Sequence, residues 1–199
     1  MSTSTLSTSS LDTSTLDTTT LMTVEQFAQM HTAETEDYEL VEGELVPLSS
    51  ATPLHARIRD LFGDLIRSYF RRNPIGEAFA EVDCRLSDHT DRRPDLSIFL
   101  ADRAKQIDLN RIPVPFAPDI AVEVLSPPEA AVAVNRKALE YLAAGSKEVW
   151  LLDNINGEIF VQTDGHMRLL RGKDLLESPL LPGFSHAVDE ILLADYAKL

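Results

Sequence analysis

Two carboxylates in this sequence lie within apolar segments, where charged side chains are uncommon. Glu123 is at the centre of "DIAVEVLS" (residues 119–126), and Asp95 follows a proline in "RPDLSIFL" (residues 93–100). An unpaired carboxylate in apolar surroundings loses its hydration, so each of these residues needs a cation, a proton or a metal ion beside it. The two residues are therefore the first candidates for a functional site.

Both segments have the alternation that is typical of strands, in which every second residue shares a face. Asp95 then lies on the face of Ser97, and Glu123 on the face of Ala121. If the strands are neighbours, the carboxylates converge, and a divalent cation between them relieves their repulsion; oxygen ligands completed by water are what magnesium selects. The alternative is structural: Asp95 caps a turn after Pro94, and Glu123 pairs with an arginine.

Lys137 is the cation that the next helix offers to Glu123. It lies at the edge of an apolar stripe with helical spacing, formed by Val134, Ala138, Tyr141 and Leu142. A lysine at such an edge can extend into solvent, or it can reach Glu123 if the helix packs back on the sheet. In the second arrangement the three residues have the chemistry of a phosphodiester-cleaving centre: a metal ion on Asp95 and Glu123, and an ammonium beside the attacking water or the phosphorus.

The surrounding sequence predicts the elements that position these residues. We expect an α/β fold with a mixed sheet, built as a helix, three strands, a helix and a strand, with an N-terminal β-hairpin and a C-terminal β extension. A short helix precedes the hairpin, and a loop from about 101 to 117 separates the second and third strands. In chain order the expected elements are a helix in 22–31, a hairpin in 38–50 around Glu42-Gly43, a helix in 52–73, strands in 77–86, 93–100 and 118–126, a helix in 129–144, strands in 148–153, 157–162 and 166–172, and a closing element in 178–192.

The first 22 residues repeat a five-residue unit of Ser and Thr with single leucines. Such a segment buries too little apolar surface to offset the entropy lost on ordering. We therefore expect a disordered Ser/Thr-rich leader over residues 1–22 and one domain over residues 23–199.

Composition narrows the function classes. The net charge of -14 disfavours tight nonspecific binding of nucleic acid, although arginines gather in 57–72 and at Arg92-Arg93 and leave local basic patches open. The single cysteine, Cys84, excludes an internal disulfide framework. Without a long apolar run or a secretory signal, we expect a soluble, cytoplasmic protein that does not bind membranes.

Six ordered motifs together resemble the Uma-type restriction-endonuclease-like family, within the PD-(D/E)XK nuclease superfamily. The likeness covers about residues 23 to 196 and rests on His55 and on the runs "YELVEGELVPLS", "RRPDLSIFL", "PDIAVEVLSP", "RKALEYLAAGSKEVWLLD" and "SPLLPGF". The resemblance implies the superfamily fold, which has the order of elements given above. It also implies a magnesium-dependent attack of water on a phosphodiester, with manganese as a substitute.

Residue by residue, the resemblance assigns Asp95 to the PD aspartate and Glu123 to the acidic residue of the third strand. The carbonyl of Val124 is the implied third protein ligand of the metal. Lys137 matches a lysine moved to the following helix, because Leu125 stands where the superfamily has its lysine. Glu44 and His55 match recurrent family positions, and we expect them at the edge of the cleft as a ligand, base or positioning group; the alternatives are a solvated hairpin charge and a helix-start histidine. Ala133 stands where family members commonly have an aspartate, and Glu129 is the candidate to compensate for that replacement.

These features give a leading interpretation and two alternatives. The leading one is a metal-dependent endonuclease acting on DNA, in which Lys137 orients or stabilises the nucleophilic hydroxide and bulk water protonates the leaving 3'-oxygen. A homodimer is expected by analogy with enzymes that cut two strands. The alternatives are a catalytically weakened binding or assembly module of the same fold, indicated by the net charge and by Ala133, and a hydrolase of small phosphoesters.

Overall fold

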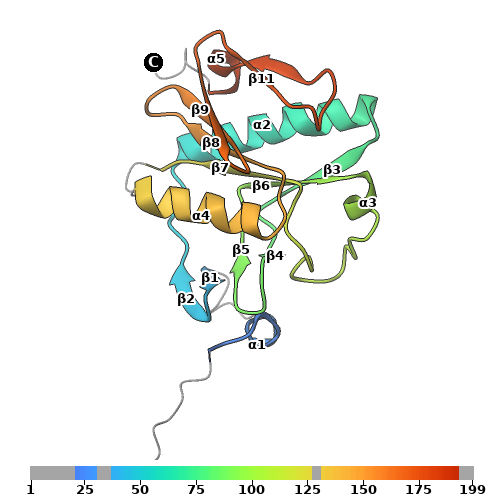
Figure 1. Ribbon diagram of the computed structural model, residues 1–199, viewed down its shortest axis with the longest axis vertical. Helices are drawn as coiled ribbons and strands as arrows, with labels where there is room; N and C mark the ends of the chain where they lie inside the picture. The colour runs from blue at the N-terminus through green and yellow to red at the C-terminus, as the bar shows by residue number, and fades with distance from the viewer. Residues whose placement is uncertain (1–20, 31–36, 127–130, 193–199) are drawn as a thin grey trace, which may run out of the picture.

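A six-stranded mixed sheet forms the centre of the protein (Figure 1). The structure is a computed structural model and describes residues 21–30, 37–126 and 131–192. The strand order is β10-β9-β8-β7-β6-β3, and only the β7–β8 pair is parallel. The strands are β3 (Gly76–Ala80), β6 (Leu96–Leu100), β7 (Ile120–Val124), β8 (Glu148–Asp153), β9 (Glu158–Thr163) and β10 (His166–Arg171). The expected α/β class with a mixed sheet is confirmed.

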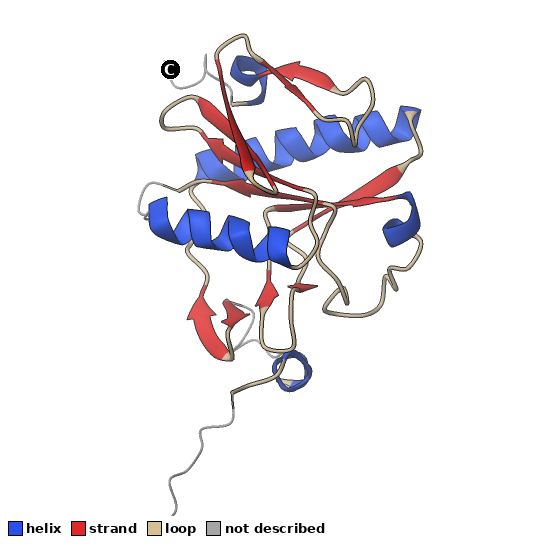
Figure 2. Ribbon diagram, viewed as in Figure 1, coloured by secondary structure: helices blue, strands red, loops and turns tan. Residues whose placement is uncertain are grey.

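Two helices cover opposite faces of this sheet (Figure 2). Helix α2 (Pro53–Arg72) begins at the cap Thr52, whose hydroxyl accepts the His55 N–H, and buries an aromatic and aliphatic stripe against β6, β7 and β8. Helix α4 (Ala131–Ala143) packs Ala138 and Tyr141 on the other face. Each face of the sheet thus has its own apolar core, one beneath α2 and one beneath α4. The end of the sheet at which α2 begins lies between these two helices.

A second, smaller sheet carries the N-terminal hairpin. Its order is β2-β1-β5-β4, with β1 (Tyr38–Val41), β2 (Glu44–Pro47), β4 (Cys84–Arg85) and β5 (Asp91–Arg92). The turn residues Glu42 and Gly43 have φ of 51° and 82°, the left-handed backbone that a two-residue hairpin turn requires. Helix α1 (Val24–Gln29) closes this region by packing Phe27 near Leu40.

The expected strand over 77–86 is wrong as a single element. The chain takes a positive φ of 52° at Glu81, which ends β3, and the following residues leave the central sheet to pair with β5 as β4. The loop after β6 also contains one helical turn, α3 (Ala101–Ala104).

The C-terminal extension continues from the central sheet. Antiparallel pairing of β9 with β10 extends the sheet, and a short ladder of β11 (Leu175–Glu177) and β12 (Ser185–Ala187) leads to helix α5 (Val188–Ile191). These elements pack beside α2 (Figure 1).

Residues 1–20 of the expected leader, and the expected helix start at 129–130, lie outside the described residues. The last part of the leader is described: Met22 packs against the α1 region, and its carbonyl lies 2.9 Å from His89 Nδ1. No helix in the described ranges combines the length and apolar character needed to cross a membrane.

Candidate active site

Asp95 and Glu123 come together where β6 begins and β7 ends. Leu96 pairs with Val122 in the antiparallel register, so Asp95, one residue earlier, stands across from Glu123. The Val124 N–H donates a hydrogen bond of 2.7 Å to Asp95 Oδ2. Asp95 is therefore fixed against the strand that carries Glu123.

His55 holds the other oxygen of Asp95 from the first turn of α2. Its Nε2 lies 2.8 Å from Asp95 Oδ1, and its Nδ1 lies 3.1 Å from the hydroxyl of Ser126. Burial favours the neutral imidazole, but the hydrogen bond to Asp95 and the charge of Asp95 outweigh burial and raise the pKa of His55 above its ordinary value. His55 thus acts as a support for Asp95, and its Nδ1 contact joins it to the end of the β7 segment.

Lys137 points from α4 to Glu123. Its Nζ is 3.0 Å from Glu123 Oε1, and the Tyr141 hydroxyl, one helical turn further along, donates a hydrogen bond of 2.8 Å to the same oxygen. The Lys137 side chain is 19% exposed. The solvent-directed arrangement and the pairing of Glu123 with an arginine are therefore not what the structure contains.

Glu39 of β1 is a third carboxylate at this site that the sequence interpretation missed. Its Oε1 lies 3.3 Å from Lys137 Nζ and accepts the Arg93 N–H, and its Oε2 accepts a hydrogen bond of 2.8 Å from Arg92. The available signal was the one used for Glu123: a carboxylate inside an alternating apolar strand, here between Tyr38 and Leu40. Only 5% of the Glu39 side chain is exposed.

The surroundings shift the pKa values of Glu123, Glu39 and Lys137 in different ways. Burial, with smaller contributions from Asp95 and Glu39, raises the pKa of Glu123 to about 7, although Lys137 opposes the change. Burial also acts on Glu39, but Lys137 and Arg92 outweigh it, and the pKa of Glu39 is lowered. Burial disfavours the ammonium of Lys137, yet Glu123 and Glu39 raise its pKa above the ordinary value. Glu39 and Lys137 are therefore ionised at neutral pH, whereas Glu123, with its pKa raised to about 7, is partly protonated there.

The donor set fits a magnesium ion that keeps most of its water. Within the described ranges, no group of three or more His, Cys, Asp and Glu side chains is arranged to hold a metal ion. Asp95 and Glu123 instead offer two carboxylates, and the hydrogen bonds that described residues make to Glu123 end on Oε1. Magnesium is commonly held by one or two carboxylates with several waters. A cation there would also supply the positive charge that the raised pKa of Glu123 indicates is lacking.

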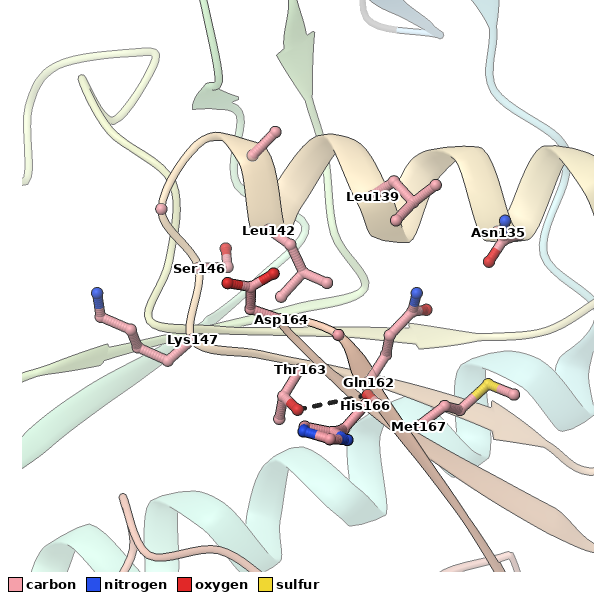
Figure 3. Close-up of a pocket in the computed structure, with 13 residues that line it drawn as sticks. Asn135, Leu139, Leu142, Ser146, Lys147, Gln162, Thr163, Asp164, His166 and Met167 are labelled. Carbon is pink, nitrogen blue, oxygen red and sulfur yellow. Dashed lines mark hydrogen bonds between the residues drawn. The ribbon is translucent and has the colours of Figure 1, made fainter.

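A cavity of about 370 Å³ opens beside Glu123 and Lys137. The hairpin residues Val46, Pro47 and Leu48 form part of its wall, and Leu125 lines it at the position where the superfamily lysine is expected. A larger pocket of about 860 Å³ lies elsewhere, between α4 and the β9–β10 turn, with Leu139, Lys147 and Met167 among its lining residues (Figure 3). That pocket contains neither Asp95 nor Glu123.

Glu44 and Ala133 are two other residues that the sequence singled out. Glu44 is exposed on β2 opposite Val41, and none of the described hydrogen bonds or ion pairs joins it to Asp95, Glu123 or Lys137. The side chain of Ala133 lies outside the described part.

The arginine pair before β6 does not form a surface patch. Arg92 bonds Glu39 and Glu140, and Arg93 donates through Nε to Asp83 over 2.6 Å. On α2, Arg59 pairs with Asp60 and with Glu81. The local basic patch that the sequence left open at Arg92-Arg93 is therefore not formed, because Glu39, Glu140 and Asp83 pair with these side chains.

Comparison with known proteins gives the same assignment as the motifs. The model of the Uma2 family, described as "Putative restriction endonuclease", matches residues 24–190. The chain belongs to the Uma2 family. No curated protein matches the sequence.

A solved structure has the same fold. It is described as "a putative nuclease belonging to DUF820 from Anabaena variabilis ATCC 29413" and superposes with a TM-score of 0.76 at 24% identity, over 86% of this chain and 98% of that one. At this identity the likeness establishes the fold. Family membership supports a nuclease-like function for the chain.

Proposed function

We propose that this chain is a divalent-metal-dependent endonuclease that hydrolyses phosphodiester bonds of DNA. The observation that supports this most is the meeting of Asp95, Glu123 and Lys137, which come from three separate elements, at one end of the sheet. Membership in a restriction-endonuclease-like family gives the reaction class.

In this proposal Asp95, Glu123 and the Val124 carbonyl hold a magnesium ion, for which manganese substitutes. The ion, when bound, supplies Lewis acidity toward a phosphoryl oxygen and toward the attacking water. The other roles are assigned to side chains of the protein. The Lys137 ammonium stabilises negative charge that develops around the phosphorus, and His55 keeps Asp95 in its ligating orientation through the 2.8 Å contact.

We also propose that Glu44 lies at the edge of the cleft. Glu44 is exposed on the hairpin, so it is accessible to a bound DNA strand and does not join the trio of Asp95, Glu123 and Lys137. Protonation of the leaving 3'-oxygen is assigned to bulk water. A homodimer, expected by analogy, is tested by light scattering on the purified protein.

The experiment is a nicking assay on supercoiled plasmid with magnesium or manganese. The wild type should convert the plasmid to the open circle, and Asp95→Asn and Glu123→Gln should abolish conversion while circular dichroism stays unchanged. Glu148→Gln is the matched control, because Glu148 is also a buried glutamate but binds Trp150 and Ser178 away from the trio. Equal nicking by Asp95→Asn and the wild type would remove the proposal.

The alternative of a weakened binding or assembly module has two sequence observations in its favour: the net charge of -14 and Ala133 in the place of a common aspartate. It predicts an intact plasmid and no turnover of bis-p-nitrophenyl phosphate. A hydrolase of small phosphoesters also predicts an intact plasmid, but with metal-dependent turnover of bis-p-nitrophenyl phosphate.

A further inference from the structure

Lys137 is shared between two carboxylates rather than paired with one. Its Nζ lies 3.0 Å from Glu123 Oε1 and 3.3 Å from Glu39 Oε1. The two glutamates come from different sheets, Glu123 from β7 of the central sheet and Glu39 from β1 of the small one. The ammonium therefore has a second partner within reach if the first is taken by another cation.

Glu39 is held more firmly than Glu123. Arg92 and the Arg93 N–H bind its two oxygens at 2.8 Å each, and Arg92 is itself held by Glu140 of α4 at 2.6 Å. Glu123 receives only Lys137 and Tyr141 among the described residues, both on Oε1. Glu39 is thus the fixed partner of Lys137, and Glu123 is the exchangeable one.

A divalent cation at Glu123 would repel the ammonium and compete with it for the carboxylate. Among the described residues, only Glu39 and Glu123 lie at ion-pair distance from Lys137. If Glu39 were absent, a metal ion that displaced Lys137 from Glu123 would leave a buried ammonium without either of these partners, at a high cost in free energy. With Glu39 in place, Lys137 keeps a partner and stays beside the reaction centre.

We propose that Glu39 is a positioning residue that retains Lys137 when a divalent cation binds Asp95 and Glu123. The proposal rests on the metal-dependent function given above. Glu39 touches neither substrate nor metal in this role; it acts through Lys137.

The test is manganese binding to the full chain, measured by isothermal titration without DNA. Glu39→Gln should weaken manganese binding about 10- to 100-fold, the usual range for a residue that orients a ligand environment. Glu148→Gln, which neutralises an equally buried glutamate outside the site, should bind manganese as the wild type does. Thermal melting checks that each variant is folded.

A double-mutant cycle separates action through Lys137 from a plain loss of negative charge. In the Lys137→Met background, Glu39→Gln should change manganese affinity by less than about 2-fold, because the residue through which Glu39 acts is gone. A loss as large as in the native background would overturn the positioning role, since it would come from charge alone.

The other outcomes of these experiments also test the role of Glu39. Wild-type affinity in Glu39→Gln overturns the positioning role while the proposed function stands, and the comparison with Glu148→Gln settles this even if Lys137→Met does not fold. Failure of the wild type to bind manganese overturns both proposals.

Discussion

Replacement of Glu123 by glutamine should abolish nicking and yet stabilise the metal-free protein at alkaline pH. Burial raises the pKa of this carboxyl from its ordinary 4.5 to about 7. A group whose pKa is higher in the folded state stabilises the fold at low pH, and that stabilisation is lost as the pH rises from about 4.5 through 7. Glutamine keeps an oxygen for Lys137 and Tyr141 but never ionises.

The magnitude follows from the size of the change. Each pKa unit corresponds to ~1.4 kcal/mol, so the wild type loses ~3 kcal/mol across the whole window. Between pH 5 and pH 8.5 the advantage of Glu123→Gln over the wild type should therefore grow by about 2–3 kcal/mol. The side chain is 12% exposed, so solvent screening reduces this figure little.

Urea unfolding at the two pH values, with a chelator present, measures the effect. Glu148→Gln, which replaces a buried glutamate outside the site, is measured in parallel as the control. A constant difference between Glu123→Gln and the wild type at both pH values would refute the reasoning, because it would mean that Glu123 is neutralised within the protein and has no need of a metal ion.

Three further predictions concern neighbouring groups. Asp91 is 3% exposed, its Oδ1 has no hydrogen-bond partner among the described residues, and burial raises its pKa to about 8. Asp91→Asn should therefore stabilise the protein at pH 9 on the order of 3–5 kcal/mol and much less at pH 5. Urea unfolding measures the difference, and equal effects at both pH values would contradict this. Lys137→Met should lower the nicking rate about 10²–10³-fold and should also destabilise the metal-free fold, because Glu39 and Glu123 lose a shared cation; unchanged single-turnover kinetics would refute its role. His55→Gln should weaken manganese binding about 10-fold or more through loss of its contact with Asp95, and calorimetric affinity equal to the wild type would show that Asp95 needs no such support.

The local sequence was sufficient for the elements that carry the trio. Alternation in the two apolar segments predicted β6 and β7. Their adjacency was a condition of the site hypothesis, and the antiparallel pairing of β6 with β7 meets that condition. The apolar stripe of α4 placed Lys137 at an edge from which it reaches the sheet, and Ala138 and Tyr141 are buried as that stripe predicted.

Features that depend on distant partners were not accessible in this way. Nothing in the run 77–86 marks the break at Glu81, because β4 leaves the central sheet only to pair with β5. In the sequence Arg92 and Arg93 look like surface cations, but the fold pairs Arg92 with Glu39 of β1 and Arg93 with Asp83 of the connection between β3 and β4. Glu39 carried the same signal as Glu123, but its role depends on how the hairpin is placed against α4.

The most direct test of the account is an anomalous-diffraction experiment on crystals soaked in manganese. We expect one strong manganese peak between the carboxylates of Asp95 and Glu123, with Lys137 turned toward Glu39. An empty site at millimolar manganese, or a peak that Asp95 and Glu123 do not share, would contradict it.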